Sequence, residues 1–554
     1  MISKYILSIV LLLPAFVTCN RSPLIEIEQG KIRGVVKKDW KGGRFYSFLK
    51  VPYAKPPIGE RRFKDPQPAE KWDGILEAEI DMPQCVQLDS NKKIVGQEDC
   101  LYMNIHTPNV ATKNLRPVMV FIHGGGYTVG SGQLDMFGPE FFLPEKIVLI
   151  TINYRLGFFG FLNFENPEIG VPGNAALKDQ NLALKWIQKN IEMFGGDPGS
   201  VTLFGESAGG ASVHMHMLSP LSKGLVHRVI AQSGSANCIW NEAQKNTGIY
   251  LAENLNFSVD DEKEILKYLQ SIPIDDIIKV EKKSDRLLPL HKIPLFGPVV
   301  EPLHSGDIFL SESPAKILSR GQFQKLPFIL GFNSNEVLVV YAQDMLIYGE
   351  LKEMPEHYFI PHQLNVTDEE SKQNLFNRIK KQYKINEYKA GTEKYSKLFS
   401  EIFIIYGVYA SISEHVLVDH KDLYLYKFSS DTKLNYFKQM HEDIAKMPGA
   451  GHVEELGYLF KNKFTPKDLT QNSIEGQNII KMVKLWTNFA KHGKPTPKNN
   501  DLGVSWLKVT RNKLNYLDIS TDSLITKVEP FDRKNMEFWD KLLGKSVKYE
   551  HTEL

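Results

Sequence analysis

The segment Val201-Thr202-Leu203-Phe204-Gly205-Glu206-Ser207-Ala208-Gly209-Gly210 carries the strongest structural signal in the sequence. An apolar run typical of a β-strand leads into a G-x-S-x-G pentapeptide, and a segment compatible with a helix follows it. This context predicts a nucleophile elbow, a strained turn that projects the hydroxyl of Ser207 above a sheet. Small residues leave room for such a turn, and the helix N-terminus behind it directs backbone N–H groups toward developing negative charge. A surface turn with a chance pentapeptide is the alternative, and the flanking strand and helix disfavour it.

Apolar runs and helical stretches alternate on both sides of this elbow. We predict strands over residues 118–123, 147–154, 201–204, 228–232, 327–331 and 423–428. Helices are predicted over residues 173–194 and, as the last helix, over residues 479–491, which end before the stop signals Gly493 and Pro495. This order predicts an α/β fold, with a mostly parallel twisted central sheet and helices on both of its faces. The helical, charged region at about 340–420 is expected to cap the carboxyl edge of the sheet, where ligands bind in such folds.

A glycine-rich loop, His123-Gly124-Gly125-Gly126-Tyr127, directly follows the first of these predicted strands. It matches the HGGG-type loop that supplies hydrogen-bond donors to an oxyanion. Such donors must be bare backbone N–H groups, because a side chain would block the approach of the substrate oxygen. We expect the N–H groups of Gly125, Gly126 and Ala208 to be these donors. The alternative is a plain glycine turn, which the position ahead of the elbow disfavours.

A nucleophilic serine of this type requires an acid and then a histidine later in the chain. Fifteen histidines compete for the role of base. We select His452, because it lies in a late glycine-rich loop at residues 449–452 that is accessible and conformationally permissive. Glu336 follows the predicted strand at residues 327–331 and is our candidate for the acid. Spacing alone leaves both assignments open.

The charge balance and the two termini limit the partners and the compartment of the chain. Among 554 residues, 67 are basic and 65 acidic, which gives no support for a nucleic acid or an anionic membrane as a partner. The apolar run at residues 5–17 is too short to span a bilayer and suits a signal peptide, which we place at residues 1–19. An uncleaved anchor is the alternative. We expect one domain over residues 20–550 and no membrane span.

The last residues, His551-Thr552-Glu553-Leu554, resemble the tags that a receptor reads to retain proteins in the endoplasmic reticulum. Asn256 and Asn365 begin N-glycosylation sequons, which agree with a lumenal or secreted chain. Retention in the lumen and secretion both stay open.

Three cysteines remain after the predicted signal peptide. Cys85 and Cys100 are near enough in sequence to close a short loop in an oxidising lumen. Cys238 is then left over and is expected to be a buried thiol.

With these residues in place, the chain resembles the type-B carboxylesterases, the cholinesterase-like branch of the α/β-hydrolases, and among them the insect esterases. The matching stretches are residues 48–57, 98–101, 153–157, 173–180, 194–198, 232–235 and 296–298. The resemblance covers about residues 25–539. It implies a serine carboxylic ester hydrolase in which Glu336 and His452 complete a triad with Ser207. It also implies that Ser233 lies near the triad acid and that Cys85–Cys100 is the first disulfide of the family.

Departures from the family pattern bear on the substrate. The loop at residues 86–99 has no aromatic residue, and Val339 and Val340 stand where acetylcholinesterases carry aromatic residues, which argues against choline esters. Juvenile hormone esterases usually carry glutamine before the nucleophile, where this chain has Glu206, a neighbour that we expect beside the triad. Organophosphate-hydrolysing variants of the family carry aspartate where this chain has Gly125, so we expect inhibition by organophosphates and no turnover of them.

The implied reaction is a two-step acyl transfer that needs no metal or organic cofactor, on small to medium apolar esters of xenobiotic or endogenous origin. Candidates for an apolar pocket wall are Trp240, Phe296, Val339 and Val340, although core packing would explain each of them equally well. A non-catalytic cholinesterase-like binding protein, a slow esterase that sequesters toxic esters, and a lipase are the rival interpretations. The physiological substrate and the oligomeric state stay open.

Overall fold

The computed structural model describes residues 22–283, 290–304 and 306–544 of the chain. The predicted signal peptide at residues 1–19 and the predicted retention tag at residues 551–554 lie outside the described residues. No helix in the described part of the chain has the length and apolar character needed to cross a bilayer.

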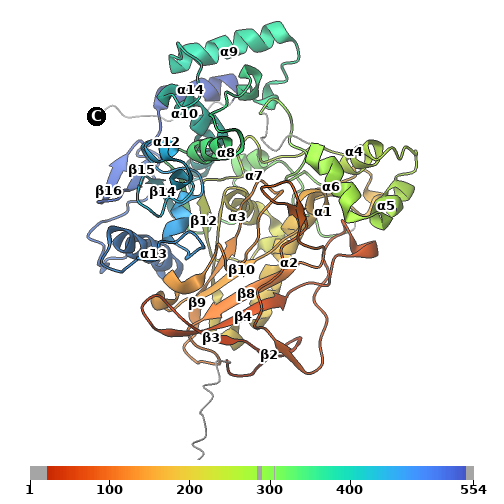
Figure 1. Cartoon of the computed structure of the whole chain (residues 1–554), viewed down its shortest axis with the longest axis vertical. Coiled ribbons are helices and arrows are strands. Elements are labelled where there is room, and N and C mark those ends of the chain that lie inside the picture. The colour runs from red at the N-terminus through yellow and green to blue at the C-terminus, as the bar shows by residue number, and fades with distance from the viewer. Residues whose placement is uncertain (1–21, 284–289, 305, 545–554) are drawn as a thin grey trace, which may run out of the picture.

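An 11-stranded sheet forms the centre of the molecule, in the order β16-β15-β14-β13-β12-β11-β9-β10-β8-β4-β3 (Figure 1). Its strands are β3 (Val35–Lys38), β4 (Arg44–Pro52), β8 (Tyr102–Thr107), β9 (Arg116–Ile122), β10 (Val148–Ile152), β11 (Gly196–Glu206), β12 (Arg228–Gln232), β13 (Phe328–Asn333), β14 (Leu423–Phe428), β15 (Asn515–Ile519) and β16 (Leu524–Val528). Neighbours from β15 across to β10 are parallel, and the pairs toward both edges are antiparallel. The predicted mostly parallel sheet is therefore confirmed.

Five short strands lie outside this sheet. They are β1 (Ile25–Ile27), β2 (Gly30–Arg33) and β5 (Ile75–Glu77), which form a three-stranded sheet, and β6 (Gln87–Leu88) and β7 (Ile94–Val95), which pair with each other.

Alternating side chains of the central strands build two separate cores. In β9, Val118, Val120 and Ile122 point into one hydrophobic cluster, whereas Met119 and Phe121 point into the other. This is the period of two that a strand imposes on its side chains. Helices close both clusters, with α2 (Ala175–Asn190) and α3 (Ala208–Leu218) on the first side and α13 (Ile474–His492) on the second. Both faces of the sheet are buried, as a parallel sheet requires.

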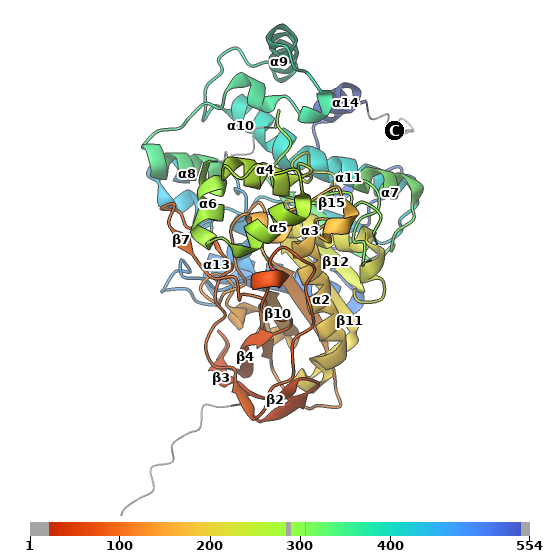
Figure 2. The ribbon, with the colours of Figure 1, turned by 90° about the vertical axis from the view of Figure 1, so that its right-hand side faces the viewer.

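The remaining helices lie around this framework. They are α1 (Gly157–Phe161), α4 (Thr247–Asn254), α5 (Glu262–Ser271), α6 (Ile274–Lys283), α7 (Pro314–Arg320), α8 (Leu338–Tyr348), α9 (Glu369–Tyr383), α10 (Glu393–Ser400), α11 (Tyr406–Leu417), α12 (Glu442–Ala445) and α14 (Arg533–Leu542). The region at residues 340–420 is helical, as expected, and α8 to α11 lie together at the end of the molecule opposite β2 and β3 (Figures 1 and 2).

The predicted helices differ from the observed ones mainly at their ends. The helix predicted at 173–194 is α2, which gives way at Ile191 to a short 3₁₀ turn. The helix predicted at 479–491 is α13, which begins earlier because the hydroxyl of Ser473 accepts a hydrogen bond from Gly476 N–H at 3.1 Å and caps it. The prediction that it is the last helix is wrong. Helix α14 follows it, capped by Asp532 and buried through Met536 and Trp539.

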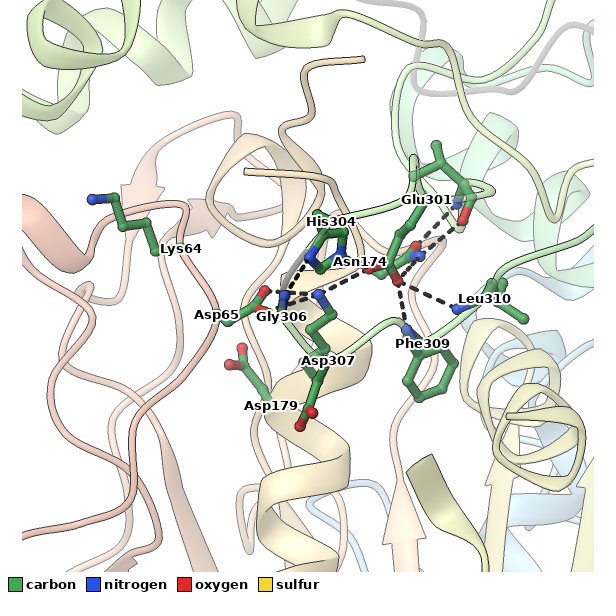
Figure 3. Close-up of polar contacts among 12 residues, drawn as sticks. Lys64, Asp65, Asn174, Asp179, Glu301, His304, Gly306, Asp307, Phe309 and Leu310 are labelled. Carbon is green, nitrogen blue, oxygen red and sulfur yellow. Dashed lines mark hydrogen bonds and ion pairs between the residues drawn. The ribbon is translucent and has the colours of Figure 1, made fainter. Parts of the chain in front are cut away.

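A buried carboxylate, that of Glu301, binds Phe309 and Leu310 and attaches them to α2 (Figure 3). Glu301 Oε1 accepts hydrogen bonds from Asn174 Nδ2 at 2.8 Å and from the backbone N–H groups of Phe309 and Leu310 at 2.9 and 3.3 Å. Its other oxygen lies 2.9 Å from Lys178 Nζ. The negative charge of Glu301 is thus fully compensated inside the protein.

The covalent and surface features expected from the sequence are in place. Cys85 and Cys100 form a disulfide, and Cys238 is a buried free thiol. Asn256 and Asn365, the predicted glycosylation sites, are exposed.

The disulfide yields a first prediction. It closes a loop with a sequence separation of 15 residues, for which the loss of chain entropy in the unfolded state corresponds to about 3 kcal/mol. We expect the double variant Cys85→Ala/Cys100→Ala to lower the free energy of unfolding by about this amount, measured by urea titration. Dithiothreitol should destabilise the wild type and leave the double variant unchanged. Equal urea midpoints for the two proteins would contradict the prediction.

Candidate active site

Ser207 lies between β11 and α3 in a strained backbone conformation, with φ 56° and ψ −122°. The surrounding backbone packs so closely that side chains are excluded. A Cβ atom on Gly209 would lie 2.1 Å from Ile122 O, one on Gly205 would lie 2.6 Å from the same oxygen, and one on Gly234 would lie 2.0 Å from Ser207 O. The strand, the sharp turn and the helix have the geometry predicted for a nucleophile elbow.

Three side chains that are far apart in sequence meet at this turn. His452 Nε2 lies 2.8 Å from Ser207 Oγ, and His452 Nδ1 lies 2.8 Å from Glu336 Oε2. Because the Glu336 carboxylate can only accept hydrogen bonds, Nδ1 carries a proton, and in the neutral imidazole Nε2 presents its lone pair to the serine hydroxyl. The arrangement can therefore remove a proton from Ser207 and stabilise the imidazolium that results.

The second oxygen of Glu336 is also occupied. Glu336 Oε1 accepts hydrogen bonds from Ser233 Oγ at 2.8 Å and from Asn333 N–H at 2.6 Å. Ser233 thus lies beside the Glu336 carboxylate, as the family resemblance implies. These bonds fix the direction in which Glu336 faces the imidazole ring.

Glu206, the residue before the serine, brings a second carboxylate to the histidine. Its Oε1 atom lies 3.1 Å from His452 Nε2, and its side chain is almost completely buried. Burial raises the pKa of Glu206 well above its ordinary value, and the charge of His452 acts in the opposite direction. The ionisation of the two groups is therefore coupled, and Glu206 is most readily negative when His452 is positive.

The same neighbours control the ionisation of the histidine. Burial lowers the pKa of His452, but Glu206 and the hydrogen-bonded Glu336 outweigh burial and raise this pKa to about 9. A general base must be neutral to accept a proton, so the competent form of His452 increases as the pH rises toward this value.

The glycine loop lies directly against the serine. A Cβ atom on Gly124 would lie 2.9 Å from Ser207 Cβ, whereas one on Gly126 would meet no atom within 4 Å. In the described part of the chain, no recorded hydrogen bond is donated by the N–H groups of Gly125 or Gly126. Ala208 is the first residue of α3, where a helix leaves its N–H without an internal partner. The N–H groups of the three expected donors are thus without a hydrogen-bond partner among the described residues, and Gly124 brings the glycine loop into contact with Ser207.

The candidate pocket residues are mostly buried in the hydrophobic core. Trp240, Phe296 and Val340 belong to the core cluster, and Val339 packs against it half-buried. The rings of Trp240 and Tyr127, the residue that ends the glycine loop, have centroids 6.4 Å apart. These contacts are compatible with a pocket wall and with plain core packing alike.

Sequence analysis did not single out three polar residues that support the site. Asn333 Nδ2 donates to Gly451 O at 2.6 Å and to Glu455 Oε2 at 2.5 Å. Glu454 Oε2 accepts a hydrogen bond from Gly451 N–H at 2.6 Å. Burial and the nearby Glu336 raise the pKa of Glu455 to about 7. The only sequence signal for them is an acidic pair directly after the glycine-rich loop of His452.

Within residues 22–283, 290–304 and 306–544, no group of three or more histidine, cysteine, aspartate or glutamate side chains is placed to hold a metal ion.

Comparisons with known proteins find similarity along most of the chain. The model of the carboxylesterase family matches residues 21–539. The chain is 34% identical to Esterase FE4 of Myzus persicae, covering 96% of this chain and 94% of that protein. It is 32% identical to the juvenile hormone esterase of Tribolium castaneum, covering 89% and 86%. The crystal structure of the juvenile hormone esterase from Manduca sexta, with OTFP covalently attached, superposes with a TM-score of 0.83 at 30% identity, covering 94% of this chain and 99% of that one.

The position of Glu206 predicts a specific pH dependence. Its negative charge raises the pKa of His452, so replacing it by the neutral isostere in Glu206→Gln should lower that pKa. We expect the ascending limb of kcat/KM against pH to have its midpoint above the ordinary histidine value in the wild type and at lower pH in the variant. Glu401→Gln, which neutralises a buried carboxylate bonded to Tyr383 and Asn535, is the control and should leave the midpoint in place. A midpoint that stays or rises in Glu206→Gln would show that the charge does not act on the base.

Proposed function

The chain belongs to the carboxylesterase family and is a carboxylic ester hydrolase with the α/β-hydrolase fold, and from this premise we propose that it cleaves small to medium apolar esters through an acyl-enzyme on Ser207. The observation that supports this most directly is the pair of 2.8 Å hydrogen bonds that join Ser207 to His452 and His452 to Glu336. The proposed substrates are xenobiotic or endogenous carboxylic esters.

In the first step, Ser207 Oγ attacks the ester carbonyl and its proton passes to His452 Nε2. The new bond joins Oγ to the carbonyl carbon, and the carbonyl oxygen becomes an oxyanion. Glu336 accepts the hydrogen bond of Nδ1–H throughout and stabilises the imidazolium. The imidazolium then gives its proton to the alkoxide as the carbon–oxygen bond breaks, so the alcohol leaves neutral.

The oxyanion is proposed to bind the backbone N–H groups of Gly125, Gly126 and Ala208. Their support is positional, since Gly124 packs against Ser207 Cβ and the space in front of Gly126 is open. Loss of one such donor costs about 10²–10³ in rate in acyl-transfer enzymes. In the second step, water gives a proton to His452 and its oxygen attacks the acyl carbon. The bond from that carbon to Ser207 Oγ then breaks, His452 returns the proton to Oγ, and the acid leaves.

An apolar acyl pocket is proposed around Trp240, Phe296, Val339 and Val340. Val339 lies close to the histidine loop, because a Cβ atom on Gly451 would be 3.4 Å from Val339 N. Trp240 approaches the glycine loop through Tyr127 and donates its indole N–H to Phe403 O at 2.8 Å. A pocket wall with this combination of aliphatic and aromatic side chains favours uncharged acyl groups.

The disulfide and the two glycosylation sequons support a proposal for the compartment of the chain. A disulfide persists in an oxidising environment, and both sequons are exposed at Asn256 and Asn365. We propose a lumenal or secreted enzyme, processed as one domain over residues 20–550, with recognition of residues 551–554 by a retention receptor as the lumenal route.

Replacing the nucleophile tests the mechanism. We expect Ser207→Ala to lower kcat on p-nitrophenyl esters by at least about 10⁴-fold, while the wild type shows a preference among acetate, butyrate and longer acyl chains. Ser411→Ala is a matched control, because Ser411 Oγ is buried without a hydrogen-bond partner in the described part of the chain, and it should keep wild-type turnover. Full activity in Ser207→Ala, or a folded wild type without turnover, would refute the mechanism.

The reaction with organophosphates tests the expectation that a chain with Gly125, in place of aspartate, is inhibited by them and does not turn them over. We expect diethyl p-nitrophenyl phosphate to release one p-nitrophenolate per wild-type chain in a burst, with no steady turnover, and no burst in Ser207→Ala. Aspartate at position 125 would need φ +108° and would place its Cβ 2.0 Å from Val129 O, so the native loop cannot adopt that arrangement unchanged. Continued release of p-nitrophenolate above the rate of the blank would contradict this expectation.

A further inference from the structure

The loop that carries His452 is hydrogen-bonded to the loop that carries Glu336. Ala450 N–H donates to Ser334 Oγ, and Ala450 O accepts from Asn335 N–H, both at 2.9 Å. The N–H of His452 donates to the backbone oxygen of Glu336 at 3.2 Å. This side of the loop positions the base relative to its acid partner.

The opposite side of the same loop is held by a buried carboxylate that has no part in the proposed chemistry. Glu454 Oε2 accepts hydrogen bonds from Gly451 N–H at 2.6 Å and from Asn435 Nδ2 at 2.9 Å, and Oε1 accepts one from Lys438 N–H at 2.9 Å. The side chain is 0% exposed. Every partner of the two oxygens is a donor, so the site accepts a carboxylate and disfavours any group that itself donates.

A buried lysine completes this arrangement. Lys438 Nζ donates to Gly449 O at 3.0 Å and forms an ion pair with Asp431. Glu454 therefore binds a backbone N–H of the histidine loop, and Lys438 binds a backbone carbonyl of the same loop. Both contacts attach this loop to the segment at residues 431–438 rather than to the loop that carries Glu336.

The loop needs such external support because its own backbone is strained. Val453, directly after the base, has φ +68° and ψ −6°. A β-branched residue is a genuine outlier in this left-handed region, and such a conformation persists only when the surroundings enforce it.

We propose that Glu454 is a positioning residue for the base, which acts through Gly451 N–H to keep His452 Nε2 directed at Ser207 Oγ. This inference rests on the proposed function of His452. Glu454 touches neither Ser207 nor the imidazole ring in the recorded contacts of the described residues, so its effect reaches the reaction only through the loop backbone.

Glu301 provides a closely matched control (Figure 3). Like Glu454, it is buried and accepts hydrogen bonds from two backbone N–H groups and one asparagine Nδ2. Among the described residues, its hydrogen bonds and ion pairs reach the N-terminal end of α2, His304, Phe309 and Leu310, and none of the loops at the candidate site. Neutralising Glu301 thus reproduces the general cost of damaging a buried carboxylate site.

The test compares Glu454→Gln with Glu301→Gln on a p-nitrophenyl ester, with kcat expressed per titratable serine and measured below both melting temperatures. The glutamine Nε2 would face a donor, so the loop must shift. A misplacement of about 1 Å costs up to about a hundredfold in rate. We expect Glu454→Gln to lose about ten- to a hundredfold in kcat with KM within about twofold, and Glu301→Gln to melt earlier with kcat unchanged.

A second measurement separates positioning from general damage. If Glu454 and Glu336 both act by orienting His452, their effects are not independent, and Glu336→Gln/Glu454→Gln should lose less kcat than the product of the single losses. If Glu454→Gln does not fold, Glu454→Asp, which withdraws the carboxylate from Gly451 N–H, carries the same test against Glu301→Asp.

The outcomes are distinguishable. A kcat for the Glu454 variant within about twofold of wild type, equal losses for the Glu454 and Glu301 variants, or multiplicative losses in the double variant would each overturn the inference. If Ser207→Ala retained turnover, the proposed function itself would fail. If Ser207→Ala were inactive while Glu454→Gln kept full kcat, the mechanism would stand and the positioning role would fall.

Discussion

The strained backbone of Ser207 is the constraint on which the rest of the molecule depends. Its φ and ψ place the hydroxyl at the junction of β11 and α3, and a serine does not keep such a conformation unless its surroundings enforce it. Here Gly205, Gly209 and Gly234 let three backbone segments approach within distances that any Cβ atom would prevent. The buried parallel sheet fixes those segments, so the stability of the whole core supports the strain at one residue.

Several carboxyl groups are buried around Ser207 and His452. Glu206, Glu336, Glu454 and Glu455 are all removed from solvent near one imidazole. Each carboxylate in such a place requires donors or an opposite charge. Glu336 and Glu454 receive backbone N–H groups, Glu455 receives the amides of Asn333 and Gln232, and Glu206 faces His452 itself. Glu206, Glu336 and Glu455 each raise the pKa of the histidine, and in their charged form they also stabilise the imidazolium of the proposed reaction.

The sequence predicted the framework and the three residues whose side chains meet at the turn after β11, for reasons that are local. Strands at 228–232 and 423–428 coincide with β12 and β14, because apolar runs between turn residues leave little choice of register. Helix α14 was missed, since its buried face consists of few residues such as Met536 and Trp539 in a charged segment. The roles of Asn333 and Glu454 escaped prediction for another reason. The role of Asn333 depends on a contact between loops that are more than a hundred residues apart. The role of Glu454 depends on a short turn around the strained Val453. Neither feature leaves a pattern in the sequence.

The hydrogen bonds between the loops of Glu336 and His452 have a consequence for how enzymes of this architecture diversify. Two backbone hydrogen bonds, from Asn335 N–H to Ala450 O and from His452 N–H to Glu336 O, join acid and base. Together with the support from Glu454, they hold the two loops as one unit. The half-buried Val339 lies just outside that unit. Substitutions in the wall of the site can therefore change its shape while the proton-transfer path stays intact. Natural selection can therefore change which ester is bound without changing the contacts among Ser207, His452 and Glu336.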